Sequence, residues 1–219
     1  KIGTLLTPPS RRRPWKLASE ALTVDLLSGG RMILSVGVGA VDTGFKSMGE
    51  ITDRKTRAEL LDESIDILTG LWGGQPFTYE GKHYQLDEFT FSHQPPPPVQ
   101  QPRIPIWVVG AWGWPKSMQR VLKCDGVLPM IIDKNREFVD LAPDHVHQIK
   151  AFVDETRQLD SPFDIIVENT TPGNDHSAAA AKLQPWIEAG ATWWIESMWT
   201  EQDPEKWRER IQQGPPGKS

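Results

Sequence analysis

Residues 26–39 have the sequence LLSGGRMILSVGVG, and this stretch decides the fold class. Gly29 and Gly30 are a typical helix stop, because glycine readily adopts the left-handed conformation that ends a helix. The run over residues 32–38 is mostly apolar rather than alternating, which is typical of a parallel strand covered on both faces. The stretch therefore predicts a helix that ends at Gly29 and leads into a buried parallel strand.

The segments around this stretch complete a β–α–β unit. Residues 1–6 are a short apolar run that predicts a strand, and residues 14–27 predict a helix. Pro14 suits the first turn of that helix, where an N–H would have no intrahelical partner. The same alternation continues along the chain. Further helices are predicted over residues 53–72, 115–123, 146–153, 176–189 and after 203, and further strands over residues 104–109, 127–132, 164–168 and 192–196.

Six apolar strands separated mostly by helices favour a parallel sheet, and the pattern alone fits both an open sheet and a barrel. The chain starts with Lys1 rather than Met and enters a strand directly, so we expect it to start inside a fold. Two further strands before Lys1 would complete the eight of a (β/α)8 barrel. We therefore predict an α/β fold of the TIM-barrel type that lacks its first two strands.

We expect residues 1–219 to form a single, N-terminally incomplete barrel domain. Residues 40–103 interrupt the repeat and are predicted to form an insertion or lid. Within this region, residues 77–84 hold two short β-prone pieces about a glycine turn. Loops of this kind often select the substrate of an enzyme.

The composition narrows the class of partner. The formal net charge is -5 and the pI is near 5.6, so no overall positive field attracts nucleic acid or an anionic membrane. The longest basic run, from Arg11 to Arg13, is short. No stretch approaches the roughly 18–20 apolar residues that a membrane helix needs. We expect neither a nucleic-acid partner nor a membrane partner.

The metal-binding side chains are few. Cys124 is the only cysteine, which excludes an intramolecular disulfide and a thiolate-rich metal site. The five histidines lack metal-ligand spacing, since even His145 and His147 point to different faces of a helix. The sequence therefore predicts a soluble, cytoplasmic protein without a metal site.

The carboxyl ends of the strands are the expected place for a site, both in an open parallel sheet and in a barrel. Gly37 and Gly39 follow one strand and flank Val38, and a missing Cβ lets a flat ring or another backbone approach closely. The sequence leaves two explanations for these glycines open, contact with a cofactor and tight packing. Gly110 to Gly113 lead from the next strand into a helix N-terminus, which suits a phosphate but also fits an ordinary turn.

Other strand ends offer weaker candidates. The loop from Pro172 to Asn174 is an alternative phosphate site. Trp112 and Trp199 lie past their strands, where they would wall a pocket or fill the core. Glu168 and Glu196 would either act as general bases or only cap backbone N–H groups and form ion pairs. Because the sequence has no Gly-x-Ser-x-Gly, Walker or complete Gly-x-Gly-x-x-Gly motif, the catalytic residues stay unassigned.

Several short segments before residue 128 share an order and spacing with one known family. The strongest is residues 26–39, a helix end, a turn and a strand with a Gly-x-Gly exit. The others are IGTLLTP (2–8), ILTGLW (67–72), FTYEGKHY (77–84), IPIWVVG (104–110) and CDGV (124–127). Together they resemble the bacterial luciferase-like family of flavin-dependent oxidoreductases. Beyond residue 127 only the order of strands and helices agrees.

This resemblance implies a (β/α)8 barrel in which Lys1 falls at the third strand. It also implies that reduced FMN or the deazaflavin F420 binds at the strand ends, and that the chain forms a homodimer. The resemblance implies two sets of contacts with the cofactor. One set faces the flavin ring, and the other lies at the loop that the ring edge and phosphate tail approach. The residues are Gly37, Val38 and Gly39 at one strand end, and Gly110, Ala111 and Trp112 at the other.

The function implied by the resemblance is that of a flavin-dependent oxidoreductase. We predict a monooxygenase that acts on a small organic substrate with FMN as cofactor. The alternatives are an F420-dependent dehydrogenase or reductase that transfers a hydride, and a non-catalytic barrel subunit or fragment. An unrelated barrel lyase or hydrolase would need an acid–base pair or a metal site, and the sequence shows neither.

Overall fold

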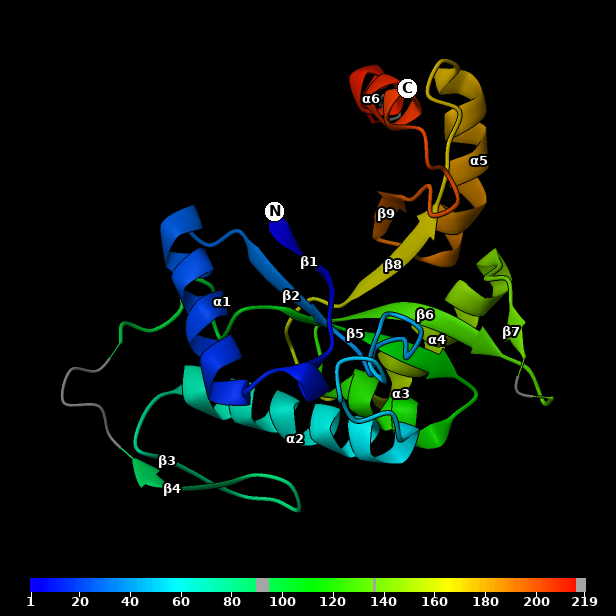
Figure 1. The fold of residues 1–219 in the computed structure, drawn as a ribbon. Coiled ribbons are helices and arrows are strands. Elements are labelled where there is room, and N and C mark those ends of the chain that lie inside the picture. The colour runs from blue at the N-terminus through cyan, green and yellow to red at the C-terminus, as the bar shows by residue number, and fades with distance from the viewer. Residues whose placement is uncertain (90–94, 136, 216–219) are drawn as a thin grey trace. The chain divides into compact units, whose positions relative to one another are not determined.

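The computed structural model describes residues 1–89, 95–135 and 137–215 (Figure 1). The chain divides into two compact units, Lys1–Val109 and Gly110–Ser219, which we call the first and the second unit. Residues 90–94 of the predicted lid region lie outside the described residues. Strand β5 (Ile106–Trp112) contains the boundary between the two units.

The first unit holds three parallel strands, two long helices and a hairpin. Strand β2 pairs in parallel with β1 on one side and with β5 on the other. Helices α1 and α2 pack against each other (Figure 1). The elements are β1 (Ile2–Thr7), the 3-10 helix η1 (Pro9–Arg11), α1 (Pro14–Ser28), β2 (Met32–Val36), α2 (Arg54–Gly73), β3 (Phe77–Glu80) and β4 (Gln85–Phe89).

Local sequence signals account for α1 and β2. Pro14 occupies the first turn of α1, and Gly29 ends it with φ of 64°, donating its N–H to the carbonyls of the last turn. Every residue of β2 is buried, as predicted for a strand covered on both faces. The predicted helix and stop are confirmed, and the strand is confirmed but ends at Val36 rather than at residue 38.

Helix α2 begins at an N-cap and ends beside the hairpin. The Asp53 carboxylate accepts a hydrogen bond of 2.7 Å from the Thr56 N–H, which satisfies one of the free donors of the first turn. Gly70 lies inside the helix, where a Cβ would come within 1.9 Å of the Phe77 ring. The hairpin therefore packs directly on the helix backbone at this glycine.

The hairpin differs from the prediction for residues 77–84. Strands β3 and β4 are antiparallel, but β4 starts only at Gln85, and residues 81–84 form the turn. The reason is a side chain from another element, because the N–H groups of Lys82, His83 and Tyr84 donate to the Glu63 carboxylate of α2. These donors are therefore not available to a strand ladder.

The second unit repeats the alternation of strands and helices. Strands β6, β8 and β9 are parallel, and the short strand β7 pairs with β6 in antiparallel fashion. Both residues of β7 are exposed, so no hydrophobic alternation could predict it. The elements are α3 (Pro115–Leu122), β6 (Gly126–Ile132), β7 (Phe138–Val139), α4 (Pro143–Thr156), β8 (Asp164–Asn169), α5 (His176–Ala189), β9 (Trp193–Glu196) and α6 (Pro204–Gln213).

Strand β5 corrects the predicted end of the strand at residue 109. It continues through Gly110 and Ala111 to Trp112, so these residues are the last of a strand and not a loop beyond it. The extension has a packing reason. A Cβ on Gly110 would lie 2.6 Å from a Val127 methyl group and 2.7 Å from one of Val121, so the strand backbone lies directly against its neighbours here.

Candidate functional site

The strand end after β2 is closely packed within the first unit. Gly37 is buried, and a Cβ there would lie 3.1 Å from Val109 and 3.2 Å from Leu6. Gly39 has φ of 76°, and its Cβ would lie 2.8 Å from Phe45 Cζ and 2.9 Å from Pro8 Cβ. Close packing therefore explains both missing side chains, and contact of these residues with a cofactor stays a prediction.

Arg57 fixes the backbone of this strand end, and the sequence analysis missed it. Its Nη1 donates to the carbonyl oxygens of Val38 and Gly39, at 2.7 Å each, and the residue is only 5% exposed. Two guanidinium groups lie over the Phe45 ring, that of Arg57 at 5.2 Å and that of Arg11 at 4.8 Å from the ring centroid. Arg57 precedes Leu61 by one helical turn, so a charged residue on the apolar stripe of α2 was the available signal.

The charge of Arg57 persists at neutral pH. Burial, with repulsion from Arg54, lowers the pKa of the Arg57 guanidinium, but arginine starts far above neutrality. The two hydrogen bonds to carbonyls are therefore charge-assisted, which makes them shorter and stronger than neutral ones.

Two backbone donors at this strand end are free. Within residues 1–89, 95–135 and 137–215, the N–H groups of Gly39 and Ala40 have no acceptor. Gly39 is half-buried and Ala40 is exposed. A carbonyl or anionic oxygen of a ligand would satisfy either donor.

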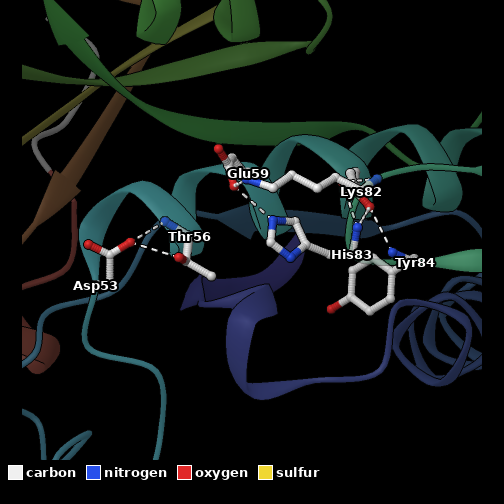
Figure 2. Close-up of polar contacts among 7 residues, drawn as sticks. Asp53, Thr56, Glu59, Lys82, His83 and Tyr84 are labelled. Carbon is white, nitrogen blue, oxygen red and sulfur yellow. Dashed lines mark hydrogen bonds and ion pairs between the residues drawn. The ribbon is translucent and has the colours of Figure 1, made fainter.

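The hairpin turn holds the first half of α2 through two carboxylates (Figure 2). Glu63 accepts hydrogen bonds of 2.9 to 3.1 Å from three consecutive N–H groups of the turn. Glu59 contacts Lys82 Nζ at 2.7 Å and His83 Nε2 at 2.8 Å, as Figure 2 shows. The bonds from Lys82 and His83 lower the pKa of Glu59 from 4.5 to about 2. The part of α2 that carries Arg57 is therefore anchored to the hairpin.

The predicted contacts at the end of β5 have partners within the second unit. The Ala111 N–H donates to Ser117 Oγ at 2.9 Å, so this donor is already satisfied. Trp112 is half-buried, donates from Nε1 to Gln148 at 3.2 Å and meets the Phe152 ring edge-on, with ring centroids 5.8 Å apart. Contact of these residues with a cofactor stays a prediction.

Glu196 is paired, in line with the alternative that it only caps and pairs. It accepts from the Thr171 N–H at 2.5 Å and hydroxyl at 2.8 Å, and Arg210 Nη2 lies 3.0 Å from its carboxylate. Burial raises the pKa of Glu196, but these hydrogen bonds outweigh it and lower the pKa overall. An ionised, fully paired carboxylate is a poor general base.

The other candidates of the second unit are partnered or covered as well. Trp199 is 76% exposed and donates to Glu168 at 3.1 Å, so it does not wall a pocket there. At Gly173 a Cβ would meet the Gln213 side chain of α6, which covers the alternative phosphate loop. A cavity of about 330 Å³ beside β9 and α6 is instead lined by Trp194 and Trp207.

A larger groove lies in the first unit, and none of the predicted site residues lines it. It has a volume of about 480 Å³ and lies among α1, the end of α2 and β4. Its walls are mainly apolar and include Trp15, Leu22, Leu71, Trp72 and Leu86. In the part of the chain that the structure describes, no group of His, Cys, Asp and Glu side chains is placed to hold a metal ion. No helix there has the length and apolar character to cross a membrane.

A known protein family matches nearly the whole chain. The family model described as luciferase-like monooxygenase matches residues 1–216. The chain belongs to this family. One relative is the F420-dependent glucose-6-phosphate dehydrogenase of Microbacterium testaceum, 32% identical over 119 residues, which are 51% of this chain and 32% of the relative. Another is the oxygenase component of the flavin-dependent trigonelline monooxygenase of Acinetobacter baylyi, 33% identical over 106 residues, which are 48% of this chain and 28% of the relative.

Solved structures of the luciferase-like family share the fold. The F420-dependent tetrahydromethanopterin reductase of Methanopyrus kandleri has a TM-score of 0.67 at 17% identity, with 98% of this chain and 82% of that chain covered. The FMN-bound oxygenating constituent of 3,6-diketocamphane monooxygenase from Pseudomonas putida has a TM-score of 0.68 at 15% identity, with 97% and 77% covered. The predicted α/β fold of the (β/α)8 type is confirmed, with this chain as a partial barrel. The matched region is about a third of the length of the curated relatives.

Proposed function

We propose that the chain is part of a flavin-dependent oxidoreductase, a monooxygenase that acts on a small organic substrate with FMN. Membership of the luciferase-like family is the observation that carries this proposal. The strand end after β2 supports it, because the free N–H groups of Gly39 and Ala40 match a planar ring that carries carbonyl oxygens.

The residues of the chain would bind and orient the cofactor. Gly37, Val38 and Gly39 would lie against the ring, and their close packing keeps this surface rigid. Residues 110–112 would contact the ring edge, and the N-terminus of α3 would receive the phosphate tail. When bound, the cofactor supplies hydride transfer or oxygen activation.

Binding of FMN to the purified full-length protein tests this function. Titration with FMN, oxidised and then reduced under nitrogen, is followed by the absorbance and fluorescence of the flavin. We expect saturable binding of FMN. If neither FMN nor F420 binds in either redox state, the proposal is wrong and a non-catalytic barrel subunit or fragment is the better description.

F420-dependent hydride transfer is the second candidate. It is favoured by the similarity to F420-dependent glucose-6-phosphate dehydrogenases, one of which is 37% identical over 101 residues in Amycolatopsis mediterranei. Parallel titrations with FMN and F420 at equal concentrations separate the two candidates. Tighter binding of F420, together with cofactor reduction that does not consume oxygen, would favour the dehydrogenase.

We infer that the loop-rich region of residues 40–103 supplies a lid over the substrate and that residues 1–219 belong to one barrel domain. We also infer a homodimer in the cytoplasm. Size-exclusion chromatography with light scattering tests the dimer, and a dimer that forms only at millimolar concentration would argue against it.

A further inference from the structure

Arg57 occupies a position where an apolar residue would continue the buried stripe of α2. The stripe includes Leu61 and Ile65, each one turn further along the helix. Burying arginine here has a cost, since its Nε is buried and has no hydrogen-bond partner among the described residues. The charged guanidinium group does form hydrogen bonds at the strand end, where Nη1 donates to the carbonyl oxygens of Val38 and Gly39.

These two contacts determine where the following N–H groups point. In a trans peptide the C=O and the N–H point in opposite directions. The carbonyls of Val38 and Gly39 both point at Arg57, so the N–H groups of Gly39 and Ala40 point away from it. Because both carbonyls accept from the same nitrogen, the two N–H groups lie on the same side of the chain, and the positive φ of 76° at Gly39 is one that glycine readily adopts. Such a pair forms a small concave site for an oxygen atom.

We propose that Arg57 is a positioning residue that aims the N–H groups of Gly39 and Ala40 at a carbonyl oxygen of the cofactor ring. This inference rests on the proposed function. The acceptor belongs to the pyrimidine part of the ring, which FMN and F420 share. Hydrogen bonds to this oxygen stabilise the electron-rich reduced ring, so they affect both the affinity and the spectrum of the bound cofactor.

The test compares three variants of the full chain. Arg57→Met removes the donor but keeps an apolar side chain of similar length. Arg57→Lys is the conservative replacement, because a single nitrogen makes both contacts in the native protein. Lys55→Met is the matched control, since Lys55 is exposed on the same turn of α2. Circular dichroism of each variant without cofactor establishes that it is folded.

We expect Arg57→Met to bind FMN, or F420 if that is the native cofactor, about 10-fold more weakly than the native chain, as for the weakening of two hydrogen bonds. Its bound-ring absorbance should shift, Arg57→Lys should recover part of both effects, and Lys55→Met should change neither. A folded Arg57→Met variant with native affinity and native spectrum overturns the positioning role while leaving the proposed function intact. Absence of cofactor binding by the native chain overturns both.

Hydrogen exchange gives a second measurement that does not depend on the variants folding. In the native chain, saturation with cofactor should slow the exchange of the Gly39 and Ala40 amides, because each then donates to the ring. Unchanged exchange at both amides in a cofactor-saturated chain overturns the inference. Slowed exchange in the native chain supports donation from these amides to the ring even if Arg57→Met does not fold, and Arg57→Lys then tests the positioning role.

Discussion

Replacement of Gly39 by alanine tests two reasons for a glycine at this position, the close packing around the absent Cβ and the positive φ. The new Cβ would lie 2.8 Å from Phe45 Cζ and 2.9 Å from Pro8 Cβ, closer than carbon atoms normally approach. The φ of 76° adds a backbone cost of about 1–2 kcal/mol for any residue with a Cβ. Overpacking adds about 1–3 kcal/mol. We therefore expect Gly39→Ala to lower the free energy of unfolding by about 2–5 kcal/mol.

Gly29→Ala is the matched control for this substitution. Gly29 also has a left-handed φ, 64°, but a Cβ there meets no atom within 4 Å, so only the backbone cost of about 1–2 kcal/mol remains. Urea unfolding followed by tryptophan fluorescence measures both variants. We expect a clearly lower midpoint for Gly39→Ala at a similar slope. Equal midpoints would refute the packing argument, and the missing Cβ of Gly39 would then need another explanation.

Three further substitutions test other parts of the structure. Glu63→Gln should lower the free energy of unfolding by about 1–3 kcal/mol, because it removes the charge from a buried acceptor of three N–H groups, whereas Glu20→Gln at an exposed ion pair should change it little. The lowered pKa of Glu59 stabilises the fold above pH 4.5, and this contribution is lost as the pH falls toward 2, so Glu59→Gln should reduce the change of the melting temperature with pH between these two pH values. Gly110→Ala should lower the melting temperature because its Cβ would overlap Val127, and an unchanged value would show that β5 can shift.

The parts of the fold set by neighbouring residues could be predicted from the sequence. Helix α1 begins at Pro14 and ends at Gly29, and both signals lie within the segment itself. Helix α5 (His176–Ala189) was predicted with its observed bounds despite Pro185. The six predicted apolar strands all occur, in the predicted order, as β1, β2, β5, β6, β8 and β9, because an apolar run is visible without knowledge of what it packs against.

The parts set by distant residues could not be predicted. The sequence predicts that residues 82–84 belong to a β-prone piece after the glycine turn, but Glu63 binds their N–H groups and keeps them in the turn. The continuation of β5 through Gly110 depends on Val121 and Val127, which approach from other elements. In both cases the deciding atom comes from a segment whose position is known only once the chain has folded.

The candidate site shows why strand-end glycines are ambiguous evidence of function. A cofactor ring and a packed side chain both require a missing Cβ, so Gly37 and Gly39 fit either in the sequence. The structure shows that packing already accounts for them, since neighbouring side chains would meet each Cβ. The evidence for a ligand therefore comes from the direction in which the Gly39 and Ala40 N–H groups point. The absence of a Cβ says nothing about this direction. Arg57 sets that orientation from another element, so the residue that best reports on the site is one that the Gly-x-Gly motif does not contain.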